Sequence, residues 1–170
     1  LKLPLMVGVS RKSLLGVNDF NDNDLKDSLS AAISYPLIQK GVDYLIDAYK
    51  NIDTDMKLVI AGGANYTKGY YDKVVENVKK DERIILTGFV QGEELQELYS
   101  NCYLYCLPSD VEGMPISLME AMSYGRRCLT SDIDENIQVT GKYGMTFKKG
   151  NVDDLKNFST GILWDDKNSS

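Results

Sequence analysis

The stretch KLVIAGGANYTKGYYDKVVENVKKDERIILTGF, residues 57–89, contains two short apolar runs separated by an amphipathic segment. The runs 57–62 and 83–89 have the length and composition of buried strands, and residues 70–80 have the length of a helix. A strand, a helix and a second strand in this order form a βαβ unit, in which helices cover two parallel strands. The stretch therefore predicts part of an α/β domain.

The same alternation continues on both sides of this stretch. In the segment 41–51, four apolar side chains recur with helical spacing and are expected to face the sheet; they are Val42, Leu45, Ile46 and Tyr49. Because crossovers between parallel strands are right-handed, the pattern predicts an open doubly wound parallel sheet of the Rossmann-like kind. The predicted strands are 29–34, 57–62, 83–89, 103–108 and 127–131, and the predicted helices are 41–51, 70–80, 93–101 and 115–125.

The two ends of the chain, and the segment after the last predicted strand, lack this pattern. Residues 1–28 are predicted to be an N-terminal connection that can include a first strand, because their second half is rich in Asn, Asp and Ser. The Rossmann-like domain is predicted to span residues 29–158. The segment 132–144 is expected to be rich in loops, and residues 159–170 are expected to form a tail that frays after Trp164.

The composition excludes several classes of function. Apolar residues make up 43% of the 170 residues, which is enough for one domain with a sizeable core. The formal net charge of −6 removes the electrostatic attraction that draws basic proteins to nucleic acids and anionic lipids. Nucleic acid and membrane are therefore not expected as partners. No apolar run approaches the ~20 residues of a membrane-spanning helix, so the chain is expected to be cytoplasmic.

The chain has no histidine, which excludes a Ser-His-Asp triad and most zinc sites. Its three cysteines, Cys102, Cys106 and Cys128, lie in apolar surroundings without the spacing of a metal or redox motif. They are expected to be buried thiols. Proton-transfer chemistry in this chain would therefore depend on carboxylates, lysine or tyrosine.

The loops that follow the predicted strands are candidate binding sites, because doubly wound sheets bind ligands at the carboxyl ends of their strands. Lys40 precedes a predicted helix and could meet a phosphate there, although a solvated lysine is the alternative. Gly62, in the loop 61–69, could bring the backbone close to a ligand or simply form a tight turn, and this loop matches no P-loop or dinucleotide fingerprint. Phe89 and Val90 could border a flat base, or they could form a hydrophobic staple for the next helix.

The loop SDVEGMP, residues 109–115, precedes a predicted helix and combines an acid, a glycine and a proline. Gly113 frees the backbone, and Pro115 suits the first turn of a helix because it lacks the N–H that would stay unpaired there. The remaining N–H groups at such a helix start attract anions. A carboxylate such as Glu120 can accept hydrogen bonds from two neighbouring ribose hydroxyls, and Glu112 could face the same cleft. The alternative for each glutamate by itself is a solvated surface side chain.

These motifs resemble the C-terminal, donor-binding domain of the retaining glycosyltransferases with the GT-B fold, known as glycosyltransferase family 4. The resemblance covers residues 30–158, and Glu112 and Glu120 match the E-x7-E signature of the family. The matching stretches, in the order of the family, are KGVDYLIDAY, LVIAGG, ILTGFV, PSDVEGMPISLMEAM and TSDIDEN. The resemblance implies one of two Rossmann-like domains, whose partner is a missing N-terminal acceptor domain. The chain by itself is therefore expected to be inactive.

The resemblance also implies a role for each matching residue. Glu120 would bind the ribose of a nucleotide sugar, and Lys40 would bind its diphosphate. Glu112 would lie near the donor sugar, so that Glu112 and Lys40 are the candidate catalytic residues. The candidate donor-binding residues are Gly62, Phe89, Val90, Gly113, Met114, Pro115, Ile116, Ser117, Leu118 and Glu120. The implied reaction needs no metal ion and no cofactor, because a helix dipole and basic side chains stabilise the leaving diphosphate. A UDP-sugar is favoured over a GDP-sugar as the substrate.

The sequence departs from the family pattern at several positions. Ser34 and Tyr35 stand where the family has Gly-Arg, and the arginine normally shares the charge of the diphosphate. Gln138 stands where many relatives have glutamate. The Asp-x-Asp pair within residues 131–134 resembles a metal motif of the other glycosyltransferase fold, but its place after the last predicted strand favours a capping role.

The expected function is that of the donor-binding domain of a retaining hexosyltransferase, which transfers a sugar from a nucleotide sugar to a glycan or a lipid-linked acceptor. Bacterial polysaccharide synthesis is the common setting, at the inner face of the membrane through the missing half. One alternative is a non-catalytic module that has lost donor binding, which the tyrosine at position 35 favours. A sugar-nucleotide epimerase of the same overall fold is another. A flavodoxin-like regulator fits the strand and helix pattern but gives no reason for Glu112, Gly113, Pro115 and Glu120 together.

Overall fold

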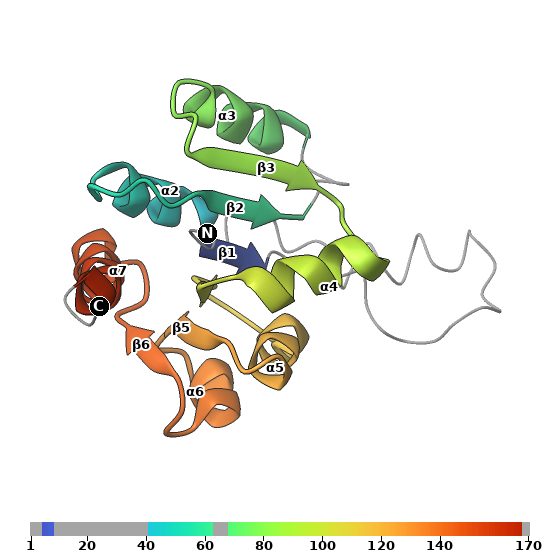
Figure 1. Ribbon diagram of the computed structural model, residues 1–170, viewed down its shortest axis with the longest axis vertical. Helices are drawn as coiled ribbons and strands as arrows, with labels where there is room; N and C mark the ends of the chain where they lie inside the picture. Colours follow the sequence, from blue (N-terminus) through green and yellow to red (C-terminus); the bar gives the residue numbers. More distant parts are fainter. Residues whose placement is uncertain (1–4, 9–40, 63–67, 168–170) are drawn as a thin grey trace, which may run out of the picture.

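The computed structural model describes residues 5–8, 41–62 and 68–167, and these residues form a six-stranded parallel sheet with helices on both faces (Figure 1). The strands are β1 (Leu5–Gly8), β2 (Leu58–Ala61), β3 (Ile84–Gly88), β4 (Leu104–Leu107), β5 (Arg127–Ser131) and β6 (Met145–Phe147). The helices are α2 (Val42–Lys50), α3 (Lys68–Val78), α4 (Gly92–Asn101), α5 (Ile116–Ser123), α6 (Asp134–Thr140) and α7 (Val152–Lys167). The predicted doubly wound, Rossmann-like fold is confirmed.

The sheet has the strand order β3-β2-β1-β4-β5-β6, with β1 in the middle. Leu5 pairs in parallel with Leu58 of β2 on one side and with Leu104 of β4 on the other. The chain order therefore reverses between β1 and β4, and this is the point where doubly wound sheets bind ligands. The central strand comes from within residues 1–28, and the strand predicted at 29–34 lies outside the described residues.

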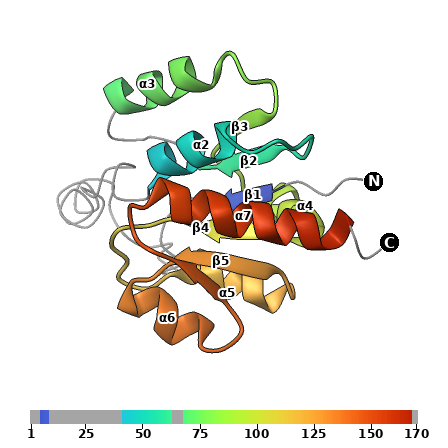
Figure 2. The same ribbon diagram turned by 90° about the vertical axis from the view of Figure 1, so that its left-hand side faces the viewer.

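Two apolar clusters fill the space between the sheet and the helices on either face. Because strand side chains alternate, Leu104 and Cys106 of β4 face the cluster that contains α2 and α7, which pack against each other (Figure 2). Tyr105 and Leu107 of β4 face the opposite cluster, which includes buried residues of α4 and α5. The predicted apolar stripe of α2 is buried, as expected.

The three cysteines are free and buried, which confirms the prediction from their surroundings. Burial raises the pKa of Cys102 to about 11 and that of Cys128 to about 12. Burial also raises the pKa of Cys106, beside β5 in the sheet. These thiols therefore stay protonated and apolar in the folded chain.

The structure corrects the expectation of a loop-rich segment at 132–144, because residues 134–140 form α6. The buried side chains of this helix are Asn136 and Thr140, one turn apart. Since the buried face is polar, the apolar periodicity that signals a helix is missing from the sequence.

The C-terminal region also differs from its prediction, because α7 continues past residue 158 to Lys167 instead of fraying. Asn151 caps this helix, its Oδ1 accepting a hydrogen bond from the backbone N–H of Asp154 at 3.0 Å. Leu155 and Ser159 are buried one turn apart, so the helix packs on the sheet across the predicted boundary. None of the helices in the described ranges has the length and apolarity to cross a bilayer.

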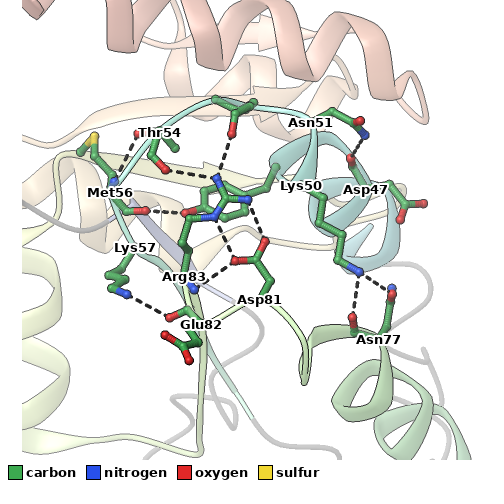
Figure 3. Close-up of polar contacts among 12 residues, drawn as sticks. Asp47, Lys50, Asn51, Thr54, Met56, Lys57, Asn77, Asp81, Glu82 and Arg83 are labelled. Atoms are coloured by element: carbon green, nitrogen blue, oxygen red, sulfur yellow. Dashed lines mark hydrogen bonds and ion pairs between the residues drawn. The ribbon is translucent and has the colours of Figure 1, made fainter.

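A polar cluster around Arg83 lies at the end of the sheet where β2 and β3 begin (Figure 3). The guanidinium donates hydrogen bonds to the carbonyl oxygens of Ile52 (2.9 Å) and Thr54 (3.1 Å). It also lies 4.9 Å from the ring centroid of Tyr49. Two further bonds, of 2.9 and 2.7 Å, reach the carboxylate of Asp81 and hold the pKa of that carboxyl below its usual range. Arg83 therefore joins the segments before β2 and β3 and serves the fold.

Candidate functional site

The candidate site lies at the carboxyl end of β4, in the loop of residues 108–115 that leads to α5. Ser109 is fully buried, and its Oγ donates a hydrogen bond of 2.6 Å to Oε1 of Glu112. The carbonyl oxygen of Ser109 in turn accepts a hydrogen bond from the buried Ser131 hydroxyl at the end of β5. Asn136 Nδ2 completes the chain by donating to Ser131 Oγ at 3.1 Å. The half-buried Glu112 is therefore connected to α6 by a series of hydrogen bonds through Ser109 and Ser131.

The start of α2 contacts the same loop from the other side of the switch point. Gly41 has a φ of +65°, and a Cβ there would lie less than 3.0 Å from the carbonyl oxygen of Pro108. The Tyr44 hydroxyl lies 2.9 Å from that carbonyl oxygen and 2.5 Å from Oδ1 of Asp110. Burial, and then the hydrogen bond to Asp110, raise the pKa of Tyr44, so that the hydroxyl remains a donor. Lys40 immediately precedes Gly41 but lies outside the described residues, as do Ser34 and Tyr35.

Two backbone N–H groups at the start of α5 already have hydrogen-bond partners within the chain. Pro115 is buried and immediately precedes the helix, so it stands one position before the first turn that the sequence predicted for it. The N–H groups of Ile116 and Leu118 donate to the carbonyl oxygens of Met114 (2.9 Å) and Pro115 (3.0 Å). These two N–H groups were among the expected anion donors. Gly113 and Met114 are exposed at the mouth of the loop, whereas the Leu118 side chain is buried in the core.

Glu120 is half-buried on α5, and its Oε2 lies 3.1 Å from the hydroxyl of Tyr99 on α4. Ser117, three residues earlier, accepts a hydrogen bond of 2.8 Å from the hydroxyl of Tyr105. Of the four candidate residues on this helix, Ser117 and Glu120 are therefore contacted by tyrosine hydroxyls from other elements. Tyr44, Tyr99, Ser109 and Ser131 were not predicted as site residues, because each stands in an apolar or polar run without a motif.

The remaining predicted residues in the described part of the chain directly follow two neighbouring strands. Gly62 follows β2, and Phe89 and Val90 follow β3. The N–H of Gly62 donates a hydrogen bond of 2.8 Å to the carbonyl oxygen of Gly88, so Gly62 continues the pairing of β2 with β3. Residues 63–67 of the loop that follows lie outside the described residues, so both interpretations of this loop stay predictions. Phe89 is 50% exposed, whereas Val90 packs in the same apolar cluster as Leu95 of α4. Val90 and Leu95 occupy the positions of a hydrophobic staple. A groove of 480 Å³ lies beside this loop and is lined by Thr87, Val90, Glu94, Glu97, Leu98 and Asn101.

The Asp-x-Asp pair has a structural use in the fold. Asp132 Oδ1 accepts a hydrogen bond of 2.8 Å from the N–H of Lys149, which ties the end of β5 to the loop after β6. Asp134 lies in the first turn of α6, where the helix dipole favours a negative charge. Gln138 is exposed on the same helix.

A family model described as "Glycosyl transferases group 1" matches residues 30–163. The chain belongs to the group 1 glycosyltransferases. The resemblance predicted from the E-x7-E motif is thereby confirmed at the level of the family.

Similar proteins support this assignment of the group 1 glycosyltransferase chain. An uncharacterised glycosyltransferase of Methanocaldococcus jannaschii, MJ1178, is 31% identical over 146 residues, which cover 83% of this chain and 40% of that protein. The O-antigen chain mannosyltransferase B of Escherichia coli is 26% identical over 132 residues, which cover 75% of this chain and 35% of that protein. The chain therefore spans less than half the length of these relatives.

Solved structures show the same fold. The crystal structure of Anabaena HepE in complex with UDP and glucose aligns with a TM-score of 0.70 at 18% identity, over 87% of this chain and 44% of that chain. The apo form of the lipopolysaccharide outer core galactosyltransferase WaaB aligns with a TM-score of 0.69 at 22% identity, over 97% of this chain and 41% of that chain. The group 1 glycosyltransferase chain thus corresponds to one half of a GT-B fold.

Proposed function

We propose that this domain binds the nucleotide sugar of a retaining glycosyltransferase and that a second domain, absent from the chain, binds the acceptor. One observation carries the proposal: the carboxylates of Glu112 and Glu120 flank the start of α5 at the switch point of the sheet, each held by a buried hydroxyl. Carboxylates at this position suit a ligand rich in hydroxyl groups. The structures of HepE in complex with UDP and glucose and with UDP-glucose support a UDP-sugar as the donor.

In this proposal Glu120 accepts hydrogen bonds from the ribose hydroxyls, and Glu112 lies beside the donor sugar. Lys40 binds the diphosphate together with the main chain of residues 113–118, while Phe89, Val90 and Gly62 border the base. Because Ile116 N–H and Leu118 N–H donate within the loop, Lys40 carries a larger share of the diphosphate charge. The transfer proceeds without a metal ion, to a glycan or lipid-linked acceptor, in the cytoplasm or at the inner face of the membrane.

A second candidate is a module that keeps the fold but no longer binds the donor. It is favoured by the same two internal hydrogen bonds, which remove anion donors from the helix start. The replacement of the family arginine by Tyr35 favours it further. This candidate predicts no affinity for any nucleotide diphosphate.

The test is the thermal unfolding of the full-length protein in the presence of UDP, GDP, ADP and their glucose or mannose conjugates. A ligand at ~100 times its dissociation constant stabilises the folded state by about 2.7 kcal/mol, which raises the melting temperature by several degrees. We expect a selective shift with UDP and UDP-sugars that Glu120→Ala abolishes. Glu82→Ala is the matched control, because Glu82 is exposed at the opposite edge of the sheet (Figure 3). A panel without any shift contradicts the proposal and supports the second candidate.

A further inference from the structure

Two buried tyrosines, one from α4 and one from β4, contact α5 through their hydroxyl groups. Tyr99 of α4 is 3% exposed and Tyr105 of β4 is fully buried. The Tyr99 hydroxyl lies 3.1 Å from Oε2 of Glu120 and 3.3 Å from the carbonyl oxygen of Ser117. The Tyr105 hydroxyl donates a hydrogen bond of 2.8 Å to Ser117 Oγ. Two tyrosines from different elements therefore contact the segment of α5 that carries Glu120.

The ring of Tyr99 is fixed by its aromatic neighbours. It stacks on Tyr124 with a centroid distance of 5.4 Å and an interplanar angle of 21°. It also packs on Tyr105 with a centroid distance of 6.1 Å. Because the ring is buried between these partners, packing decides the position of the hydroxyl, independently of Glu120.

The single proton of the Tyr99 hydroxyl can be donated to one acceptor at a time. The carboxylate of Glu120 is both the nearer acceptor and the charged one, and hydrogen bonds to charged acceptors are roughly twice as strong as neutral ones. A carboxylate offers about four lone-pair sites, so a bond from Tyr99 leaves it the capacity to accept further hydroxyl groups.

We propose that Tyr99 is a positioning residue for Glu120: its buried hydroxyl holds the carboxylate in the orientation that accepts hydrogen bonds from the ribose hydroxyls of the donor. The inference rests on the proposed function, in which Glu120 binds the ribose. Tyr99 itself touches no substrate. Its contribution is to fix the Glu120 side chain before the nucleotide arrives, which lowers the conformational cost of binding.

The test compares the affinities of the full-length protein for UDP and 2′-deoxy-UDP. Tyr99→Phe removes the hydroxyl and keeps the ring. A hydrogen bond to a charged group is worth roughly tenfold in affinity, so we expect Tyr99→Phe to weaken UDP binding by about that factor. Because 2′-deoxy-UDP lacks one of the two ribose hydroxyls that Glu120 is proposed to bind, the affinity for it should fall less. The affinity for UDP divided by the affinity for 2′-deoxy-UDP should therefore become smaller in this variant. A purely structural role of Tyr99 would weaken both nucleotides equally and would refute the inference.

Tyr103→Phe is the matched control. It also removes a hydrogen-bonded hydroxyl, which accepts a bond of 2.8 Å from Arg127, but at the edge where β4 and β5 begin. We expect this variant to keep both affinities. Tyr99→Phe in the Glu120→Ala background should cause no additional loss, whereas an undiminished loss there would overturn the inference.

Glu120→Asp is a second variant that does not alter the aromatic cluster, for use if Tyr99→Phe fails to fold. It withdraws the carboxylate from the Tyr99 hydroxyl by one methylene group, so the preference for UDP over 2′-deoxy-UDP should narrow. A fully retained preference would contradict the positioning role. Failure of the proposed function has a different result, because the wild-type protein would then show no preference between the two nucleotides or Glu120→Ala would keep it.

Discussion

Gly41→Ala is expected to be strongly destabilising, because position 41 is restricted both by its backbone conformation and by its surroundings. The φ of +65° lies in the left-handed region, which costs a residue with a Cβ about 1–2 kcal/mol. The new Cβ would also lie within 3.0 Å of the Pro108 carbonyl oxygen and of the Tyr44 ring. Overpacking of this kind adds about 1–3 kcal/mol. The expected loss in the free energy of unfolding is therefore about 2–5 kcal/mol.

Urea unfolding followed by circular dichroism measures this loss. With a slope of about 2 kcal/mol per molar urea, the midpoint should fall by roughly 1–2.5 M. Gly125→Ala is the control, because Gly125 has a φ of +66° but no atom of the described residues within 4 Å of the added Cβ. Only the backbone cost of about 1–2 kcal/mol should appear there. Equal losses in the two variants would refute the close contact between the start of α2 and the end of β4.

Two further predictions concern the core and the edge of the sheet. Since the hydrogen bonds from Arg83 lower the pKa of Asp81, they stabilise the fold above the usual carboxyl pKa near 4, and this contribution is lost as the pH falls through the lowered pKa. Asp81→Asn should therefore lower the free energy of unfolding at pH 7, and this free energy should then fall less steeply between pH 7 and pH 2 than in the wild type, as measured by urea titrations. An unchanged fall at acidic pH would contradict the ion pair between Asp81 and Arg83. Cys102, Cys106 and Cys128 should react with Ellman's reagent at pH 8 only after unfolding in urea, because burial keeps them protonated and inaccessible; rapid reaction of the folded protein would contradict their placement.

Local patterns were sufficient to predict most of the helices and strands. The apolar runs became β2 to β5, and the stripe of α2 is buried, because period and length alone distinguish these elements. The same signals failed for α6, whose buried face carries Asn136 and Thr140. They also failed at α7, where the sequence analysis ended the domain before the buried Ser159. In α6 the tertiary packing of polar side chains sustains a helix that periodicity does not indicate. In α7 the apolar Leu155 packs in the core together with the buried Ser159.

The sequence by itself determined the parallel α/β architecture and the placement of Glu112 and Glu120 around one helix start, because both follow from residues that are close together in the chain. Only the tertiary structure decided how the loop before α5 and the carboxylate of Glu120 are held. Tyr44 lies 64 residues from Pro108, and Tyr99 lies 21 residues from Glu120. A hydrogen bond between such distant residues depends on the order of the strands and on the side of the sheet that each helix covers, and no local pattern contains that information.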